Sequence, residues 1–158
     1  MALFGSKNTP LVLLESAARL GVAKSTTETS YGTGNSIIDL TRAGPIQAIV
    51  FELSCSAQAA DAGDLLDVYV QMSLDGGTTY VDVAHFTQIP GNAGAAKVYY
   101  AKIEQAQALS EFETGTALTA TNHRDLIGTH MRAKYAITND ADNTVDTSFT
   151  FSLIAVAM

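Results

Sequence analysis

The segment Leu65–Phe86 constrains the fold most strongly, because it has the pattern of one antiparallel hairpin. Since successive side chains of a strand point to opposite faces, apolar residues at every second position predict one buried face. The turn follows at Asp75-Gly76-Gly77, where glycine can adopt the positive φ of a tight hairpin. Thr79–Phe86 is the returning strand, and a slip of one residue would expose the apolar face. The alternating residues are Leu66, Val68, Val70, Met72 and Leu74.

The same alternation predicts strands elsewhere. Ile46–Ser56 is partly apolar on both faces, which is typical of a strand in the middle of a sheet. Shorter strands are expected at Ser36–Leu40 and Lys97–Ile103, where Val98 and Tyr100 face one way and Tyr99 and Ala101 the other. Near the end of the chain, Met131–Ile137 and Phe149–Ala155 alternate clearly, and we expect them to pair as a closing hairpin.

Other segments are less regular. Leu11–Leu20 can form either a strand or a short helix, because the apolar spacing of so short a run fits both. Lys24–Asn35 is rich in Thr, Ser and Gly, which indicates a loop or an irregular edge segment, and Glu104–Phe112 has some helical spacing. Residues 1–9 are expected to be a flexible arm that ends at Pro10.

Seven or eight short strands, separated by turns rich in Gly, Asn and Asp, predict an all-β fold. We expect an antiparallel β-sandwich, jelly-roll-like and with little helix, as a single domain over residues 10–158. A chain of 158 residues suits one such core.

Composition and charge narrow the classes of function. The net charge of −7 argues against binding nucleic acid, which needs clustered positive charge. No apolar run approaches the ~18 residues of a membrane span, and the N-terminal residues do not resemble a secretory signal, so we expect synthesis in the cytoplasm. Cys55 is the sole cysteine and lies in an apolar run, which predicts a small buried side chain.

Two groups of residues have the composition of a reactive site. His85, His123 and His130 are the three histidines, and Asn122-His123-Arg124-Asp125 would allow a Ser, His and Asp triad, but no nucleophile-elbow pattern is present. The loop Asn139-Asp140-Ala141-Asp142-Asn143 groups oxygen ligands that suit calcium, as do Asp61 and Asp64. Asn and Asp are also common turn residues, and we favour that interpretation. No catalytic residue, metal ligand or cofactor is therefore assigned.

The tyrosines suggest two binding roles. Exposed rings on one flat surface could stack on sugars, as in a carbohydrate-binding module. Tryptophan, which has a larger stacking face than tyrosine, is absent from the sequence. Tyrosine is also common at protein interfaces, and we favour a contact with another subunit. The tyrosines considered are Tyr31, Tyr69, Tyr80, Tyr99, Tyr100 and Tyr135.

Several short motifs resemble small virion proteins of tailed bacteriophages. The likeness covers residues 46–88 and 130–157, and the familiar pattern often has Trp where Tyr80 stands. The matching residues are Gln71, Ser73, Asp75 and Gly76, then Tyr80-Val81-Asp82, Phe86-Thr87, Arg132-Ala133 and Phe149-Thr150-Phe151.

This resemblance implies a non-enzymatic β-sandwich protein that decorates or cements the capsid exterior, with the major capsid protein as its partner. It further implies a homo-oligomer, expected to be a trimer, without nucleic acid or membrane as partner. Candidate subunit contacts are Leu3 and Phe4 in the arm, with Tyr69 and Tyr99 on the strands. The alternatives are a tail-tube or head-tail adaptor subunit and a carbohydrate-binding module.

Overall fold

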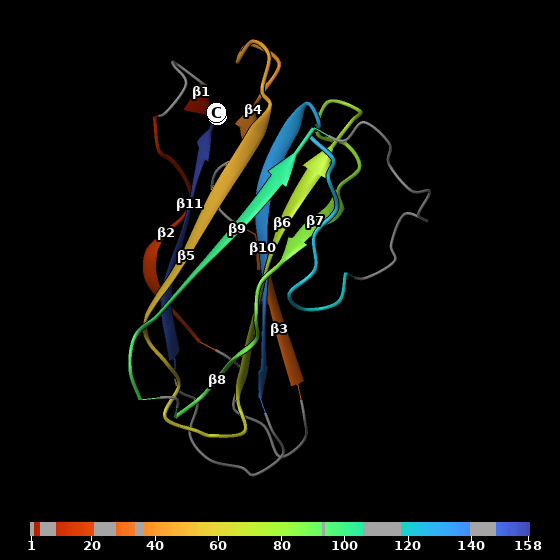
Figure 1. Cartoon of the computed structure of the whole chain (residues 1–158). Coiled ribbons are helices and arrows are strands. Elements are labelled where there is room, and N and C mark those ends of the chain that lie inside the picture. Colours follow the sequence, from red (N-terminus) through yellow and green to blue (C-terminus); the bar gives the residue numbers. More distant parts are fainter. Residues whose placement is uncertain are drawn as a thin grey trace.

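The predicted hairpin lies within one of two β-sheets that pack face to face (Figure 1). The computed structural model describes residues 2–3, 9–20, 28–33, 37–92, 94–105, 118–139 and 148–158. Strands and connecting segments, with no helix, make up these residues. The strands are β1 (Ala2–Leu3), β2 (Leu11–Leu20), β3 (Glu28–Thr33), β4 (Ile38–Asp39), β5 (Ala48–Ala57), β6 (Leu65–Ser73), β7 (Val81–His85), β8 (Ile89–Pro90), β9 (Lys97–Glu104), β10 (His130–Asn139) and β11 (Ser148–Ala157).

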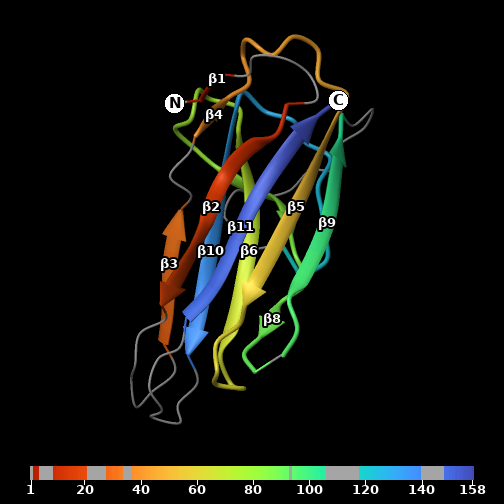
Figure 2. The same cartoon turned by 90° about the vertical axis from the view of Figure 1, so that its left-hand side faces the viewer.

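The strand order is that of a jelly roll. In the smaller sheet the order is β2-β11-β5-β9, and Figure 2 shows these four strands side by side. In the larger sheet, β10 pairs with β6 on one side and with the successive strands β3 and β4 on the other. Strands β7 and β8 pair with β6, and β1 pairs with β4.

Pairing is nested along the chain: β2 with β11, β3 and β4 with β10, β5 with β9, and β6 with β7. Successive nested pairs alternate between the sheets, which confirms the antiparallel jelly-roll prediction. The short β1–β4 pair is parallel.

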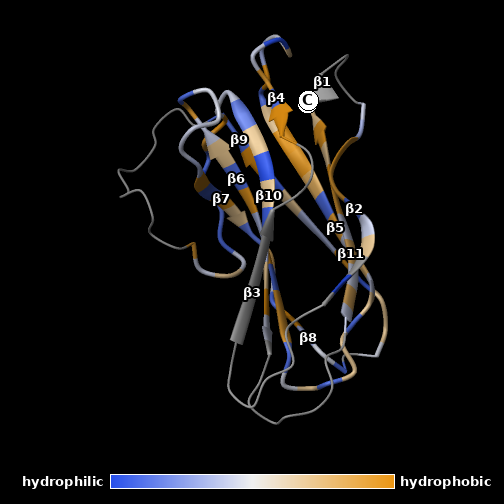
Figure 3. Ribbon diagram, turned by 180° about the vertical axis from the view of Figure 1, so that it is seen from behind, coloured by the Kyte–Doolittle hydropathy of each residue, from blue (hydrophilic) through white to orange (hydrophobic). Residues whose placement is uncertain are grey.

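The core lies between the sheets because each strand turns its apolar side inward. Figure 3 shows hydrophobic and hydrophilic residues alternating along strands such as β10. Full burial of each large side chain contributes roughly 1.5–3 kcal/mol. The fully buried face of β5 is Ile49, Phe51, Leu53 and Cys55, and that of β6 is Leu66, Val68, Val70 and Met72.

The hairpin prediction is confirmed for both strands and for the turn. Gly76 and Gly77 have φ of 76° and 91°, as a tight turn requires. The prediction was wrong for Leu74, which is 65% exposed because β6 ends one residue earlier, at Ser73.

The predicted closing hairpin was also wrong. Strands β10 and β11 follow one another in sequence, but they belong to different sheets. Their alternation correctly indicated one buried face each, and Tyr135 and Phe151 meet edge to face across the core at 5.4 Å between ring centroids. Alternation thus predicted the inward side of each strand and not its hydrogen-bonded partner.

The two segments whose secondary structure the sequence left open both contain strands. Leu11–Leu20 is β2, an edge strand of the smaller sheet, and Glu28–Thr33 within the predicted irregular segment is β3, which pairs with β10. In the expected arm, Ala2–Leu3 pairs with β4. Most of Glu104–Phe112 lies outside the described residues. The described part of the chain contains no helix long and apolar enough to cross a membrane.

Candidate functional site

An open groove of about 410 Å³ lies at one edge of the sandwich, between β7 of the larger sheet and β9 of the smaller sheet. Its remaining side is formed by residues of segment 118–125. The lining residues include His85, Phe86, Tyr99, Lys102, His123 and Asp125.

Backbone hydrogen bonds hold segment 118–125 along β7. The Thr121 amide donates to the His85 carbonyl at 2.8 Å, and the His85 amide donates to the Asn122 carbonyl at 3.1 Å. Further along, the Arg124 amide donates to the Val83 carbonyl at 2.8 Å. The segment therefore covers the edge of β7, which would otherwise offer unpaired backbone groups to another chain.

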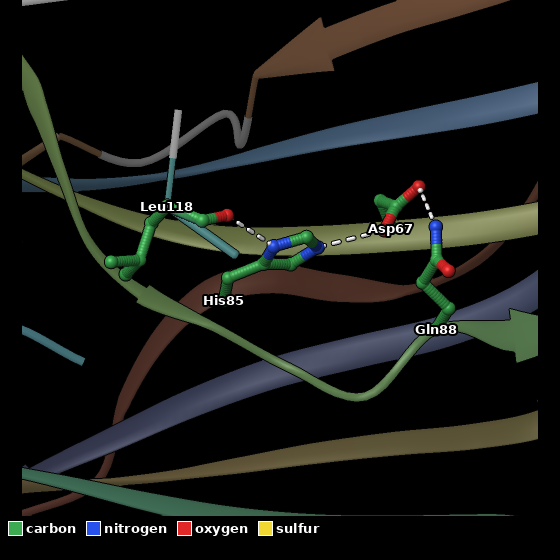
Figure 4. A network of polar contacts seen from close by, with 4 residues as sticks. All are labelled: Asp67, His85, Gln88 and Leu118. Carbon is green, nitrogen blue, oxygen red and sulfur yellow. Dashed lines mark hydrogen bonds and ion pairs between the residues drawn. The ribbon is translucent and has the colours of Figure 1, made fainter. Parts of the chain in front are cut away.

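A buried histidine fastens this segment to the larger sheet (Figure 4). The Nδ1 atom of His85 lies 2.6 Å from the Leu118 carbonyl oxygen, and its Nε2 lies 2.7 Å from Oδ1 of Asp67. A carbonyl oxygen can only accept, so Nδ1 carries a proton. The other carboxylate oxygen of Asp67 accepts from the Gln88 amide at 3.1 Å, and the Tyr69 ring stacks on the imidazole at 4.0 Å.

Both ring nitrogens of His85 are thus engaged, and neither faces the groove free to act as a base. His123 lies at the groove rim with Nε2 3.8 Å from Oδ1 of Asp125, and both side chains are more than a third exposed. His130 lies on β10 against the hydroxyl of Thr129. The fold therefore does not bring the three histidines together, and the triad considered from the sequence gains no support.

The structure describes only some of the suspected cation ligands. Asn139 ends β10, whereas Asp140, Asp142 and Asn143 lie outside the described residues. Oδ1 of Asp61 accepts from the Gly63 amide at 2.9 Å, which is the local turn bonding expected of aspartate. Within the described ranges, no three His, Cys, Asp or Glu side chains are grouped to hold a metal ion.

Tyr69, Tyr99 and Tyr100 lie on three different surfaces. Tyr69 is on the outer side of the larger sheet, stacked on His85. Tyr99 packs against the core at the groove, and its neighbour Tyr100 is 69% exposed on the outer side of the smaller sheet. They form no single flat platform of the kind a carbohydrate-binding module would use.

Among the proposed subunit contacts, the described residues lie on separate elements. Leu3 lies in β1, Phe4 lies outside the described residues, and Tyr69 and Tyr99 belong to different sheets. Their contact with another subunit stays a prediction. Cys55 is fully buried, as predicted, and burial raises the pKa of its thiol.

One surface was not anticipated from the sequence, since it combines strands from distant parts of the chain. We call it the outer face, the solvent side of the smaller sheet. One row crosses all four strands, because Ile154 is paired with both Val12 and Glu52, and Glu52 is paired with Tyr100. The outer face comprises Val12 on β2, Ser152, Ile154 and Val156 on β11, Val50, Glu52 and Ser54 on β5, and Val98, Tyr100 and Lys102 on β9.

Two polar contacts on the outer face involve its charged groups. The Tyr100 hydroxyl hydrogen-bonds to the Glu52 carboxylate, and this contact raises the pKa of Tyr100. Lys102 forms an ion pair with Glu104, which raises the pKa of Lys102. The alternation of Val98 and Tyr100, and the apolar residues on both faces of Ile46–Ser56, were the sequence signals for this surface.

No family model matches the chain, and no curated protein matches it. Among solved structures, it is similar to a chain in the structure of infectious bursal disease virus Gx strain, with 15% identity and a TM-score of 0.42. The similarity covers 93% of this chain and 31% of that one, so this chain spans about a third of the viral protein. A similarity this remote does not say what the chain binds.

Proposed function

We propose that this chain is a virion structural protein of a tailed bacteriophage, which decorates the assembled capsid as a homo-oligomer and stabilises it. The major capsid protein is its proposed partner. The resemblance in sequence implies three copies. The role is one of binding and not of catalysis, and it takes place on the capsid exterior.

One observation carries this proposal: residues that define the resemblance, although distant in sequence, contact one another on the larger sheet. The Gln71 side-chain amide donates to Oδ1 of Asp82 at 2.8 Å. Nε of Arg132, 61 residues further along the chain, donates to Oε1 of Gln71 at 2.8 Å. The Arg132 guanidinium also lies 3.8 Å from the centroid of the Tyr80 ring.

The hairpin turn completes this set. The Ser73 hydroxyl donates to Oδ1 of Asp75 at 2.7 Å, and the Gly77 amide donates to the Ser73 hydroxyl oxygen at 2.9 Å. Short motifs that merely follow strand and turn preferences need not meet in space. The first set of contacts joins β6, β7 and β10, and the second lies in the turn directly after β6, which supports the view that the motifs form a structural unit.

The proposed mechanism follows from mass action. A protein that binds only the assembled state stabilises it by about 2.7 kcal/mol per site when its free concentration is 100 times Kd. Each copy would span a seam between capsid subunits, so separating them would also require losing its contacts. Several copies in one oligomer would add avidity without tighter single contacts.

The test combines light scattering with pelleting of emptied capsids. We expect an oligomer that co-sediments at a saturable stoichiometry and that raises the temperature at which the capsids come apart. A chain unfolded in urea and diluted into the same mixture controls for trapping in the pellet. A monomer that stays in the supernatant would overturn the proposal and direct attention to a glycan array. A larger ring would instead favour the tail-tube or adaptor alternative.

Deleting residues 1–9 tests the arm separately. If Leu3 and Phe4 contact a neighbouring subunit, the deletion should lower the oligomer mass or the amount bound to capsids. An unchanged mass and unchanged binding would remove the arm from the interface.

A further inference from the structure

We infer that the free edge of β9 binds an extended segment of the major capsid protein, which adds to the four-stranded sheet as a further strand. The inference rests on the proposed function, because it takes its partner from there and assigns the contact to one site. Three observations support it: outward-facing backbone groups on β9, a groove that runs along the same edge, and the cover found on two other edges of the sandwich.

The backbone of β9 turns every second residue's peptide groups away from its neighbour β5. Antiparallel strands alternate between paired residues that exchange both backbone bonds and paired residues that exchange none. Glu104 is paired with Ala48, but the Ala48 amide and carbonyl bond to Met158, on the opposite side of β5. The Glu104 amide accordingly points away from β5 and donates to Oδ1 of Asp125 at 3.0 Å.

The same alternation turns the N–H and C=O groups of Lys102, Tyr100 and Val98 away from β5, since each lies an even number of residues from Glu104. Strand β9 is the last of its sheet, at the edge seen in Figure 2. Within the described ranges, no hydrogen bond engages these three sets of backbone groups. Unpaired groups along a strand edge form a template for another strand.

The open groove between β7 and β9 runs along this edge. A segment lying in it meets the outward peptide groups of Tyr100 and Lys102, both of which line the groove. Residues two apart on a strand are separated by about 6.8 Å, the spacing at which an added strand repeats its own hydrogen-bonding groups. Phe86 and Thr121 lie among the residues of the facing side. The groove therefore offers an extended peptide both backbone partners and a wall.

Two other edges of the sandwich are covered. Segment 118–125 lies along β7, as described above. On β2, the Arg19 guanidinium donates to the carbonyls of Glu15 and Ala17 at 2.9 Å and 3.0 Å, and shifts in register interrupt the pairing with β11. Natural sheets use such devices to prevent the addition of another strand. By contrast, β9 pairs in continuous register over Lys97–Glu104, and among the described residues only its Glu104 end is capped.

The chemistry of the groove specifies the segment it would take. Side chains of an added strand alternate between the two faces of the sheet. On the inner face they would meet Phe86 and Tyr99, which pack with the core, so apolar residues fit there. Glu104 and Asp125 place two carboxylates at one end of the groove, beside the single ammonium of Lys102. We therefore expect apolar residues at alternate positions and a basic residue at that end.

Hydrogen exchange of the unmodified chain, alone and bound to emptied capsids, tests the site directly. Mass spectrometry with fragmentation that resolves single amides is the measurement. The outward amides of Tyr100 and Lys102 should exchange rapidly in the free chain, and we expect capsid binding to slow them at least tenfold. The Ala101 amide faces β5 and is already protected, so it serves as an internal reference.

A pair of variants tests the same contact by affinity. Lys102→Pro removes one outward N–H, and proline is tolerated on an edge strand where its nitrogen faces away from the sheet. Lys102→Ala is the matched control, because it loses the same ammonium but keeps the amide. We expect Lys102→Pro to raise the Kd for capsids at least fivefold above that of Lys102→Ala, with thermal unfolding showing that both variants are folded. Exchange in the unmodified chain decides the matter if the proline variant does not fold.

Failure of this inference differs from failure of the proposed function. Capsid binding that leaves exchange at Tyr100 and Lys102 unchanged, or equal affinity of the two folded variants, would overturn the inference and leave decoration standing. Protection that appears without capsids as the chain concentration rises would assign the edge to a second copy and overturn the capsid protein as its occupant. A chain that stays in the supernatant would overturn the proposed function and, with it, this occupant.

Discussion

Oδ1 of Asp67 lies 2.7 Å from Nε2 of His85, and this buried contact joins β6 to β7 beneath the groove. The same imidazole bonds through Nδ1 to the Leu118 carbonyl, so one side chain holds together three separate parts of the chain. Polar groups buried to this degree need their partners, since water cannot replace them.

Replacing His85 should therefore destabilise the fold far more than replacing His123, although both line the same groove. His85→Ala leaves Oδ1 of the buried Asp67 carboxylate without its partner, and we expect the free energy of unfolding to fall by about 2–4 kcal/mol. His123→Ala removes an exposed contact of 3.8 Å and should cost less than about 1 kcal/mol. Urea unfolding of both variants measures the difference, and equal losses would contradict the role given to His85.

Asp75 should make stability depend on pH in the acid range. Its carboxylate accepts from the amides of Thr79 and Thr78 and from the Ser73 hydroxyl, and these hydrogen bonds hold its pKa well below the usual 3.8. A lowered pKa stabilises the folded state above pH 3.8, and this contribution is lost as the pH falls further.

Asp75→Asn, which cannot ionise, removes this dependence. We expect the Tm difference between the unmodified chain and Asp75→Asn to be largest near neutral pH and to shrink below pH 3.8. Thermal unfolding monitored by circular dichroism at several pH values is the measurement. A Tm difference that stays constant down to pH 2 would show that the lowered pKa does not contribute.

Tyr80→Phe should leave stability unchanged or increase it. The Tyr80 hydroxyl is buried and has no hydrogen-bond partner among the described residues, while the ring stacks under Arg132. Removing an unsatisfied buried hydroxyl removes a desolvation cost, which can add up to about 1 kcal/mol. Tyr100→Phe is the comparison, because it loses an existing bond to Glu52 and should not stabilise the chain. A loss above about 1 kcal/mol for Tyr80→Phe would show that the hydroxyl is satisfied.

Gly91→Ala should be among the most damaging single substitutions. A Cβ at this position would lie 1.6 Å from the Asp61 carbonyl oxygen, so the backbone itself would have to move. Gly94→Ala meets no atom within 4 Å but has a φ of +78°, a left-handed conformation that costs about 1–2 kcal/mol with a side chain. Chemical unfolding should therefore show a larger loss for Gly91→Ala, and the reverse order would argue against this close approach of the two loops.

The candidate sites show where sequence reasoning stops. A buried Asp67 was unexpected, because its position in the alternation of β6 predicted the outer side of the sheet. Segment 118–125 and Gln88 come from beyond β6, and their contacts with Asp67 or His85 arise only when the chain has folded. The outer face likewise draws on four strands that are far apart in sequence.

The sequence alone determined which side of β5, β6, β10 and β11 faces the core and where the first hairpin turns. These properties are local: backbone geometry sends alternate side chains to opposite faces, and Gly76 and Gly77 permit the positive φ of the turn. Tertiary structure alone decided the partners of the strands that no tight turn joins. Nothing in the alternation of β10 and β11 distinguishes pairing with each other from pairing with β6 and β5. That choice depends on closing both sheets over one core, where every apolar face must be covered at once.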